Sequence, residues 1–295
     1  MDAQEKEKLK QMADNFVLTG KYLHAAQIYH RLLDETGKMD YIFRLAETYL
    51  QMGFIDASDK YYISVLDEFP NNDEMRIEVS SLLIKSKNWE KIIEILSMVD
   101  SNKKSVVDFI LGFAYLKTED YKFAKHYLEK FIKSEDNPEL KIEAVYYLGI
   151  ANYHENNFEE AIKGFKESEF HQNSNADFYF YLASSYRKLG MFTHASLYIT
   201  KALRINNKSA KILLEAAKIY NKSEQFKKAH KYLKVYGDLG KEVSNDFLLT
   251  LAETFLGLNR IKDAKALIAL IDDEESENPE VIAIKSRIST LSETK

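Results

Sequence analysis

Apolar and small residues recur along the chain with the spacing of short amphipathic helices joined in pairs. The unit is clearest from Ile142 to Asn175, where Leu148, Gly149 and Phe165 recur at helical spacing and asparagines separate the two halves. Residues three or four apart share one face of an α-helix, and small residues let two helices approach closely. A helical hairpin of this kind cannot bury its apolar face alone, so it has to stack on further copies. The pattern therefore predicts a repeat protein.

Copies of the unit begin near residues 6, 39, 73, 105, 142, 176, 210 and 245. The eighth place of each copy is small, as a close helix crossing requires, and it holds Ala13, Ala46, Ser80, Gly112, Gly149, Ala183, Ala217 and Ala252. The seventeenth place is bulky throughout and holds Tyr22, Ile55, Trp89, Tyr121, Phe158, Phe192, Phe226 and Ile261. We expect eight helical hairpins and one capping helix in an all-α fold without a sheet, a single right-handed α-α superhelical solenoid over residues 1–295.

Segments such as LGIANYHENNFEEAIKGF and LASSYRKLGMFTHASLYITKAL resemble tetratricopeptide repeats, and the resemblance covers nearly the whole chain. The family pattern combines small, aromatic and alanine positions over about 34 residues. It is weakest in the third copy, where Lys87 replaces the turn glycine and Ile92 replaces the alanine of the second helix. We therefore expect a softer joint near residues 73–104.

Several boundaries follow from local signals. The first helix is expected within the first few residues and its partner from about Leu23 to Thr36. Asn137 and Asn278 each precede a proline, the order typical of an N-cap and first helical position. The segment KSEDNPEL is expected to lengthen the loop between the fourth and fifth copies.

The chain after the eighth copy is expected to cap the repeats. Val281, Ile284, Ile288 and Leu291 share one side of a helix predicted at about 279–292. The acidic run Asp272–Glu277 before it is interpreted as a solvated linker next to a helix start. The polar stretch Asp100–Lys104 is expected to be a second linker.

Composition and charge argue against several classes of function. The chain has no cysteine and a formal net charge of −5. No disulfide or cysteine metal site is possible, and a general nucleic-acid binder would need a basic surface. None of the seven histidines lies three or four residues from another, as a helical metal site would require. We expect no catalytic residue, no metal and no cofactor, so the protein is predicted not to be an enzyme.

Location is predicted from what the chain lacks. The N-terminal residues MDAQEKEKLKQMADNF are charged and contain no apolar signal-peptide core. No segment approaches the roughly 18 uninterrupted apolar residues of a membrane span. A cytoplasmic protein without a membrane span is expected.

A ligand groove is predicted from the fifth, ninth and twelfth places of the first helices, which point away from the core. The middle copies are apolar and aromatic there, with Phe109, Phe113, Tyr146, Ile150, Tyr153 and Phe180. Basic residues follow on or beside the same face, namely Arg187, Lys188, Lys218 and Lys222, joined by Lys211. The alternative is that the aromatic residues pack between neighbouring helices and that Asp177 and Glu215 balance the basic residues.

These residues predict a non-catalytic scaffold that binds a protein or peptide segment, apolar at one end and acidic at the other, in its concave groove. The family's clamp for a C-terminal carboxylate is not carried over, because Asp14 follows Lys10 by one turn and the third copy offers Glu74 and Glu78. The alternative function is a structural assembly subunit that oligomerises through the solenoid ends or the convex face. The oligomeric state stays open.

Overall fold

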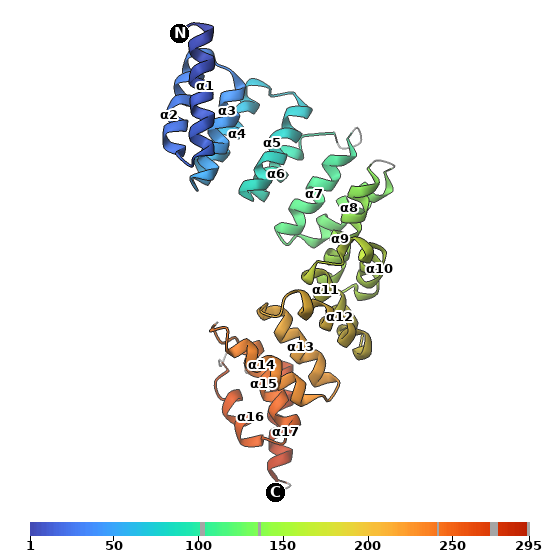
Figure 1. Cartoon of the computed structure of the whole chain (residues 1–295). Helices are drawn as coiled ribbons and strands as arrows, with labels where there is room; N and C mark the ends of the chain where they lie inside the picture. Colours follow the sequence, from blue (N-terminus) through green and yellow to red (C-terminus); the bar gives the residue numbers. More distant parts are fainter. Residues whose placement is uncertain (101–103, 135–136, 241, 272–276, 294–295) are drawn as a thin grey trace. The chain divides into compact units, whose positions relative to one another are not determined.

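The computed structural model describes residues 1–100, 104–134, 137–240, 242–271 and 277–293. These residues form α-helices and one short 3-10 helix and contain no β-strand (Figure 1). The predicted all-α fold is confirmed. Residues 101–103 and 272–276, which belong to the two predicted linkers, lie outside the described residues.

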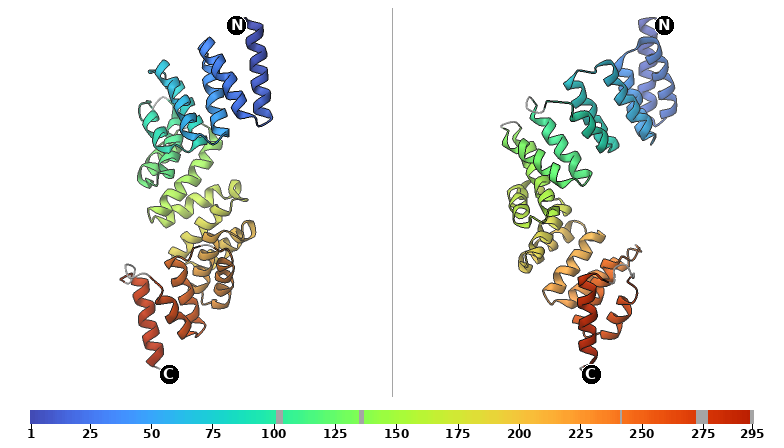
Figure 2. Two further views of the ribbon diagram at one scale, coloured as in Figure 1. Left: turned by 90° about the vertical axis from the view of Figure 1, so that its left-hand side faces the viewer. Right: turned by 180° about the vertical axis from the view of Figure 1, so that it is seen from behind.

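The chain divides into two compact units, Met1–Ala144 and Val145–Lys295. The N-terminal unit contains α1 (Ala3–Leu18), α2 (Tyr22–Thr36), α3 (Met39–Gln51), α4 (Ile55–Glu68), α5 (Asp73–Ser86), α6 (Trp89–Leu96), α7 (Ser105–Lys117) and α8 (Tyr121–Lys133). Each odd-numbered helix pairs with the next one as a hairpin, and α2, α4 and α6 contact the first helix of the following hairpin (Figure 2). The helix α9 (Pro138–His154) contains the boundary between the units.

The C-terminal unit continues with α10 (Phe158–Ser168), the 3-10 helix η2 (Glu169–Gln172), α11 (Ala176–Lys188), α12 (Phe192–Ile205), α13 (Ala210–Lys222), α14 (Phe226–Gly237), α15 (Asn245–Gly257), α16 (Ile261–Ile268) and α17 (Pro279–Glu293). Six first helices begin at the predicted residues 39, 73, 105, 176, 210 and 245. The prediction of one solenoid over the whole chain stays a prediction.

In the fourth and fifth hairpins the small eighth-place residue lies directly against a large residue of the second helix. A Cβ added to Gly112 would lie 2.7 Å from Leu128 Cγ, and one added to Gly149 would lie 2.7 Å from Phe165 Cε1. The large residue lies at the twenty-fourth place of its copy and is buried in all eight copies, as Tyr29, Tyr62, Leu96, Leu128, Phe165, Ile199, Leu233 and Ile268. This column completes the core that the small residues predict.

The turn inside every hairpin has one residue in the left-handed region, always at the fifteenth place. It is glycine in three copies and another residue in five: Gly20, Gly53, Lys87, Glu119, Asn156, Gly190, Glu224 and Asn259. The next residue donates its N–H to the carbonyl five residues earlier, as Lys21 does to Phe16 at 2.8 Å. This is the hydrogen bond of a Schellman helix end. Lys87 therefore adopts the same turn as the other copies and does not set the third copy apart.

The prediction that KSEDNPEL extends a loop is wrong for its last three residues. Pro138, Glu139 and Leu140 are the first residues of α9, which begins four residues before the expected start at 142. Asn137 Oδ1 accepts a hydrogen bond from the Leu140 N–H at 3.2 Å, so the side chain caps the helix. Proline at the first helical position loses no hydrogen bond. The added residues therefore lengthen a helix.

The last helix, α17, lies near the bounds of the predicted capping helix. Val281, Ile284 and Ile288 are buried against α15 and α16. The opposite side of the helix is exposed and carries Lys285 and Arg287. The helix α17 thus covers the apolar side of the last hairpin.

Candidate functional site

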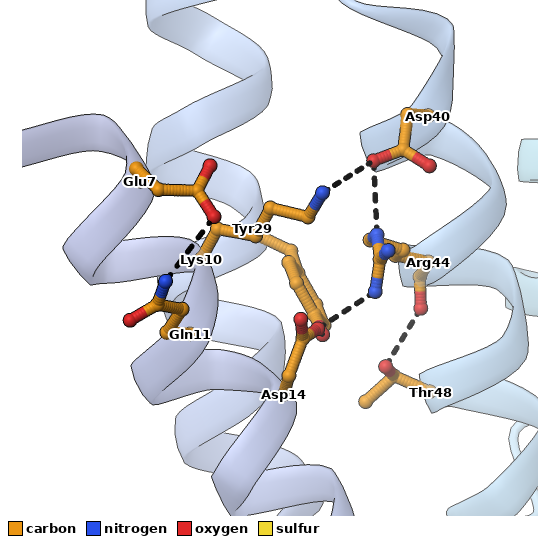
Figure 3. Close-up of polar contacts among 8 residues, drawn as sticks. All are labelled: Glu7, Lys10, Gln11, Asp14, Tyr29, Asp40, Arg44 and Thr48. Atoms are coloured by element: carbon orange, nitrogen blue, oxygen red, sulfur yellow. Dashed lines mark hydrogen bonds and ion pairs between the residues drawn. The ribbon is translucent and has the colours of Figure 1, made fainter. Parts of the chain in front are cut away.

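Charged residues on the first helices of the N-terminal unit are joined from one hairpin to the next. Asp14 Oδ1 accepts hydrogen bonds from the Tyr29 hydroxyl at 2.5 Å and from Arg44 Nη1 at 2.7 Å (Figure 3). Arg44 Nε donates to Asp40 Oδ2 at 2.9 Å. Burial, and then the carboxylate of Asp14, raise the pKa of Tyr29 to about 12. The charge of Asp14 is therefore balanced within the unit.

Glu47 repeats this arrangement one copy later. Its Oε2 accepts hydrogen bonds from Lys85 Nζ at 2.8 Å and from the Tyr62 hydroxyl at 3.3 Å. The hydrogen bond from Lys85 is the main reason that the pKa of Glu47 is lowered. Asp14 and Glu47 share the ninth place, so the first two copies carry the same acid–tyrosine–cation contact.

A cavity of about 230 Å³ lies in the C-terminal unit, where residues of α11, α13, α15 and α17 meet. Its lining includes all four basic residues singled out from the sequence, together with residues of the capping helix. The lining residues are Arg187, Lys188, Lys218, Lys222, Leu249, Thr250, Glu253, Glu280, Ala283, Ile284 and Arg287. Five of them are cationic and two are carboxylates.

Three of the five cations hold ion pairs with carboxylates of the next first helix. Arg187 Nε donates to Glu215 Oε1 at 2.6 Å, and both side chains are largely buried. Burial opposes the charge of Arg187, but Glu215 outweighs it, so the pKa of Arg187 is raised. The other two pairs are Lys218 with Asp246 at 2.7 Å and Lys222 with Glu253 at 2.8 Å.

The remaining two cations of the cavity are Lys188 on α11 and Arg287 on α17. Both side chains are exposed. No carboxylate in the described part of the chain lies within ion-pair distance of either one. These two residues can therefore meet an incoming anion without breaking an internal pair.

Lys211 belongs to the predicted basic set but not to the cavity. It forms an exposed ion pair with Asp177 at 2.8 Å. Its Nζ also lies 5.3 Å from the centre of the Phe180 ring. Glu215 thus balances Arg187, and Asp177 balances Lys211, as in the alternative that the sequence left open.

Two of the predicted apolar groove residues are packed inside the C-terminal unit. Tyr146 and Ile150 are 7% and 9% exposed. The Tyr146 ring lies 5.9 Å from Phe178, and its hydroxyl accepts a hydrogen bond from Asn175 Nδ2 at 3.3 Å. The contacts of Tyr146 join α9 to the start of α11. Both side chains therefore belong to the core of the unit rather than to an open surface.

Tyr153 and Phe180 are partly exposed in the same unit. The Tyr153 hydroxyl lies 2.9 Å from Ser184 Oγ, and its ring packs on Tyr181 at 5.2 Å. Ser184 lies one turn before Arg187 on α11, so Tyr153 places an aromatic surface beside the basic residues of that helix.

Phe109 and Phe113 belong to the N-terminal unit. Phe109 packs on Phe131 at a centroid distance of 5.3 Å. Phe113 meets Trp89 edge-on at 5.5 Å and carries Lys117 Nζ 5.0 Å from its ring centre. These two aromatic residues thus pack on neighbours in the N-terminal unit.

Residues 111–173 and 176–209 match two family models, both described as tetratricopeptide repeat. The paired helices and the columns of small and bulky residues extend the same unit through the other copies. The chain is a tetratricopeptide repeat protein.

Solved structures share this fold at low sequence identity. A tetratricopeptide repeat protein from Parabacteroides merdae is 16% identical, with a TM-score of 0.61 over 86% of this chain and 100% of that one. MamA from Desulfovibrio magneticus RS-1 is 15% identical, with a TM-score of 0.51 over 58% of this chain and 96% of that one. A search of curated proteins finds no match.

The basic site of this tetratricopeptide repeat protein includes residues that the sequence did not single out. Glu280, Ala283 and Arg287 of α17 form one wall of the cavity. The sequence signal that could have found them is the spacing of the helices. The helix α17 starts 34 residues after α15, and 34 residues is the repeat length. A helix in that position stacks as another first helix and presents its polar side to the same surface.

The described residues contain neither a metal-binding cluster nor a membrane-spanning helix. In the ranges that the structure describes, no group of three or more histidine, cysteine, aspartate or glutamate residues is placed to hold a metal ion. Among the same residues, no helix combines the length and the hydropathy of a membrane-spanning segment.

Proposed function

We propose that this tetratricopeptide repeat protein is a non-catalytic scaffold that binds a segment of another protein. The acidic part of that segment enters the cavity lined by α11, α13, α15 and α17. The observation that carries the proposal is the positive charge left in this cavity by Lys188 and Arg287, which no carboxylate of the described residues pairs with. A surface of one dominant charge attracts segments of the opposite charge and speeds their association.

The size of the cavity supports a side chain as its occupant. Small-molecule sites usually enclose roughly 300–1,000 Å³, whereas this cavity has about 230 Å³. One or two carboxylate side chains fit such a space while the backbone of the segment stays outside. Arg287 and Lys188 offer the donors, since neither has an ion-pair partner in the described residues.

The apolar part of the bound segment is proposed to lie on Tyr153 and Phe180. Tyr153 on α9 and Phe180 on α11 are both partly exposed, and both precede Arg187 and Lys188 in the chain. Burial of one large apolar anchor contributes about 1.5–3 kcal/mol. The ligand is therefore apolar at one end and acidic at the other.

The test uses a double charge reversal that breaks no internal ion pair, Lys188→Glu with Arg287→Glu. The probe is a fluorescein-labelled peptide with leucine and phenylalanine in one half and glutamate and aspartate in the other. A second peptide carries glutamine and asparagine in place of the acids. Fluorescence anisotropy at about 20 mM and about 300 mM salt separates screened charge contacts from apolar ones.

We expect the double variant to bind the acidic peptide at least about tenfold more weakly at low salt and to differ less at high salt, because exposed charges are screened. The matched control is Lys163→Glu with Lys262→Glu, which reverses two exposed charges elsewhere in the same unit and should bind like the wild type. The proposal is contradicted if the wild type, the double variant and the control bind the acidic peptide equally, or if the wild type binds the acidic and the amide peptides equally. Either result would place the interaction away from this cavity.

A further inference from the structure

A second surface, of opposite charge, lies in the N-terminal unit between the second helices α4 and α6. A cavity of about 410 Å³ is lined there by Asp56, Asp59 and Asp67 of α4 and by Asn88 and Lys91 at the start of α6. The first-helix faces that carry the candidate site do not contribute to it. This surface is independent of the proposed function.

The buried carboxylate of Asp59 is only half satisfied. Asp59 is 5% exposed, and its Oδ2 accepts a hydrogen bond from Asn88 Nδ2 at 2.6 Å. Its Oδ1 accepts no hydrogen bond from any described residue. A buried carboxylate oxygen without a donor is unfavourable, and such a group in a native protein calls for a partner. Asp59 thus points to a donor that the chain itself does not supply.

The charges around Asp59 favour a cationic donor. Asp56 and Asp67 are exposed on the same side of α4. Lys91 forms an ion pair with Glu94 at 2.7 Å, so its charge is already balanced. Lys60 is the other lysine of the lining. Three carboxylates therefore face one lysine whose charge is not taken up by an ion pair within the described residues.

The spacing of the carboxylates fits a chain segment better than an ion. Asp56 and Asp67 are eleven residues apart on one helix, which corresponds to about 16 Å along its axis. Ligands of one metal ion all lie within about 2.6 Å of it, so these carboxylates cannot share an ion. Basic side chains that follow one another on a partner segment can each meet one of them.

We propose that the α4–α6 cavity is a docking site for a basic segment of a partner protein, in which an arginine meets Asp59. The guanidinium group offers five donors in a planar fork and pairs with a carboxylate through two hydrogen bonds. Its carbon stem can lie against Ile63, which also lines the cavity. The protein then holds an acidic segment in its C-terminal unit and a basic one in its N-terminal unit.

The experiment uses three fluorescein-labelled alanine-based helical peptides that differ at three positions, spaced as Asp56, Asp59 and Asp67 are. One carries arginine, one lysine and one citrulline, which has the shape of arginine without its charge. Binding to the full-length protein is followed by fluorescence anisotropy at low salt. We expect the arginine peptide to bind most tightly and the citrulline peptide at least about tenfold more weakly.

Two variants locate the contact. Asp59→Asn keeps the shape of the side chain and should weaken binding of the arginine peptide about tenfold or more. Asp67→Asn changes an exposed residue and should weaken binding of the arginine peptide by a smaller factor. If circular dichroism shows that Asp59→Asn does not fold, the Asp67→Asn variant decides the test. The control Asp34→Asn removes an exposed charge from α2 and should bind like the wild type.

The proposal is overturned if the arginine and citrulline peptides bind equally, or if Asp67→Asn and folded Asp59→Asn bind like the wild type. Displacement of the peptide by micromolar calcium or magnesium would reassign the cavity to a metal ion. The Lys188→Glu with Arg287→Glu protein should bind the arginine peptide like the wild type. Failure here is thus distinguishable from failure of the proposed function.

Discussion

Arg187 on α11 and Glu215 on α13 form a two-point ion pair, with Nε donating to Oε1 at 2.6 Å and Nη2 donating to Oε2 at 3.2 Å. Their side chains are 15% and 6% exposed. A buried pair is sensitive to the loss of one member, because the other then stays charged without a partner. The pair therefore joins two successive first helices and makes each depend on the other.

Removing Glu215 is expected to destabilise the protein strongly. Glu215→Ala leaves Arg187 buried and unpaired, at an expected cost of about 3–5 kcal/mol. The matched control is Asp177→Ala, which breaks the exposed pair with Lys211, in which the side chains are 50% and 47% exposed. Such a pair contributes at most about 1 kcal/mol. Urea unfolding followed by circular dichroism measures both, and equal losses would contradict the role of burial.

The contact between Tyr29 and Asp14 predicts a dependence on alkaline pH. The pKa of Tyr29 is raised from 10.0 to about 12, by burial first and then by Asp14. The folded state therefore favours the protonated phenol. This contribution is complete below pH 10 and is lost as the pH rises towards 12.

The measurement compares urea midpoints of the wild type and Tyr29→Phe between pH 9 and pH 12. Phenylalanine cannot ionise, so the stability difference between the two proteins should change in favour of the variant across this range. Other tyrosines titrate in both proteins and cancel in the difference. Two curves that stay parallel would show that Tyr29 titrates alike in the folded and unfolded chain.

Two glycines of the C-terminal unit should respond in opposite ways to the same substitution. A Cβ at Gly149 would lie 2.7 Å from the fully buried ring of Phe165, whereas nothing lies within 4 Å of a Cβ at Gly237. Gly149→Ala is expected to cost about 1–3 kcal/mol through overpacking. Gly237→Ala, at the end of α14, should be neutral or stabilising by up to about 1 kcal/mol. Thermal unfolding of both variants checks the contrast.

The left-handed turn residues predict a stabilising substitution. Glu224 and Asn259 occupy the same turn position with φ values of 57° and 58°. The left-handed conformation costs an ordinary residue roughly 1–2 kcal/mol, while asparagine tolerates it better. Glu224→Gly should therefore stabilise the protein by about 1 kcal/mol and Asn259→Gly by less. If Asn259→Gly gave the larger gain in thermal midpoint, side-chain contacts rather than the turn would decide stability there.

The third copy remains the predicted soft joint. Its second helix, α6, has only eight residues, and Ser80 Oγ in its first helix is buried without a hydrogen-bond partner in the described residues. Amide hydrogen exchange should show lower protection over residues 77–99 than over residues 148–165, because short helices with fewer contacts open more readily. Equal protection of the two segments would contradict the prediction of a softer joint.

The repeat columns were sufficient to predict most helix positions. A small eighth-place residue such as Gly112 and a bulky residue such as Trp89 recur at fixed intervals, and the helices follow them. The repeat interval placed the start of α9 at residue 142 rather than 138, because an interval counts residues without saying whether they are helix or loop. The Asn137–Pro138 pair was the local signal that decides it.

The site was predicted less completely than the fold. The places that face away from the core pointed to Arg187 and Lys218, which line the cavity. The position of a residue within its repeat does not show whether the side chain is exposed or packed between neighbouring first helices. Tyr146, for example, packs against Phe178 of α11. Arg287 was missed because its place in the site depends on how α17 packs on α15 and α16, which no local pattern contains.

The ion pairs between hairpins give the copies a fixed order. Asp246 lies at the second place of the eighth copy, where it meets Lys218 at the ninth place of the seventh. The ninth place of the second copy holds Glu47. If α15 and α16 were transplanted to follow α4, Asp246 would face Glu47, and attraction would become repulsion. Copies whose apolar columns match are thus not interchangeable. A hairpin moved or duplicated to another place would set like charges against each other on neighbouring first helices and pack less stably there.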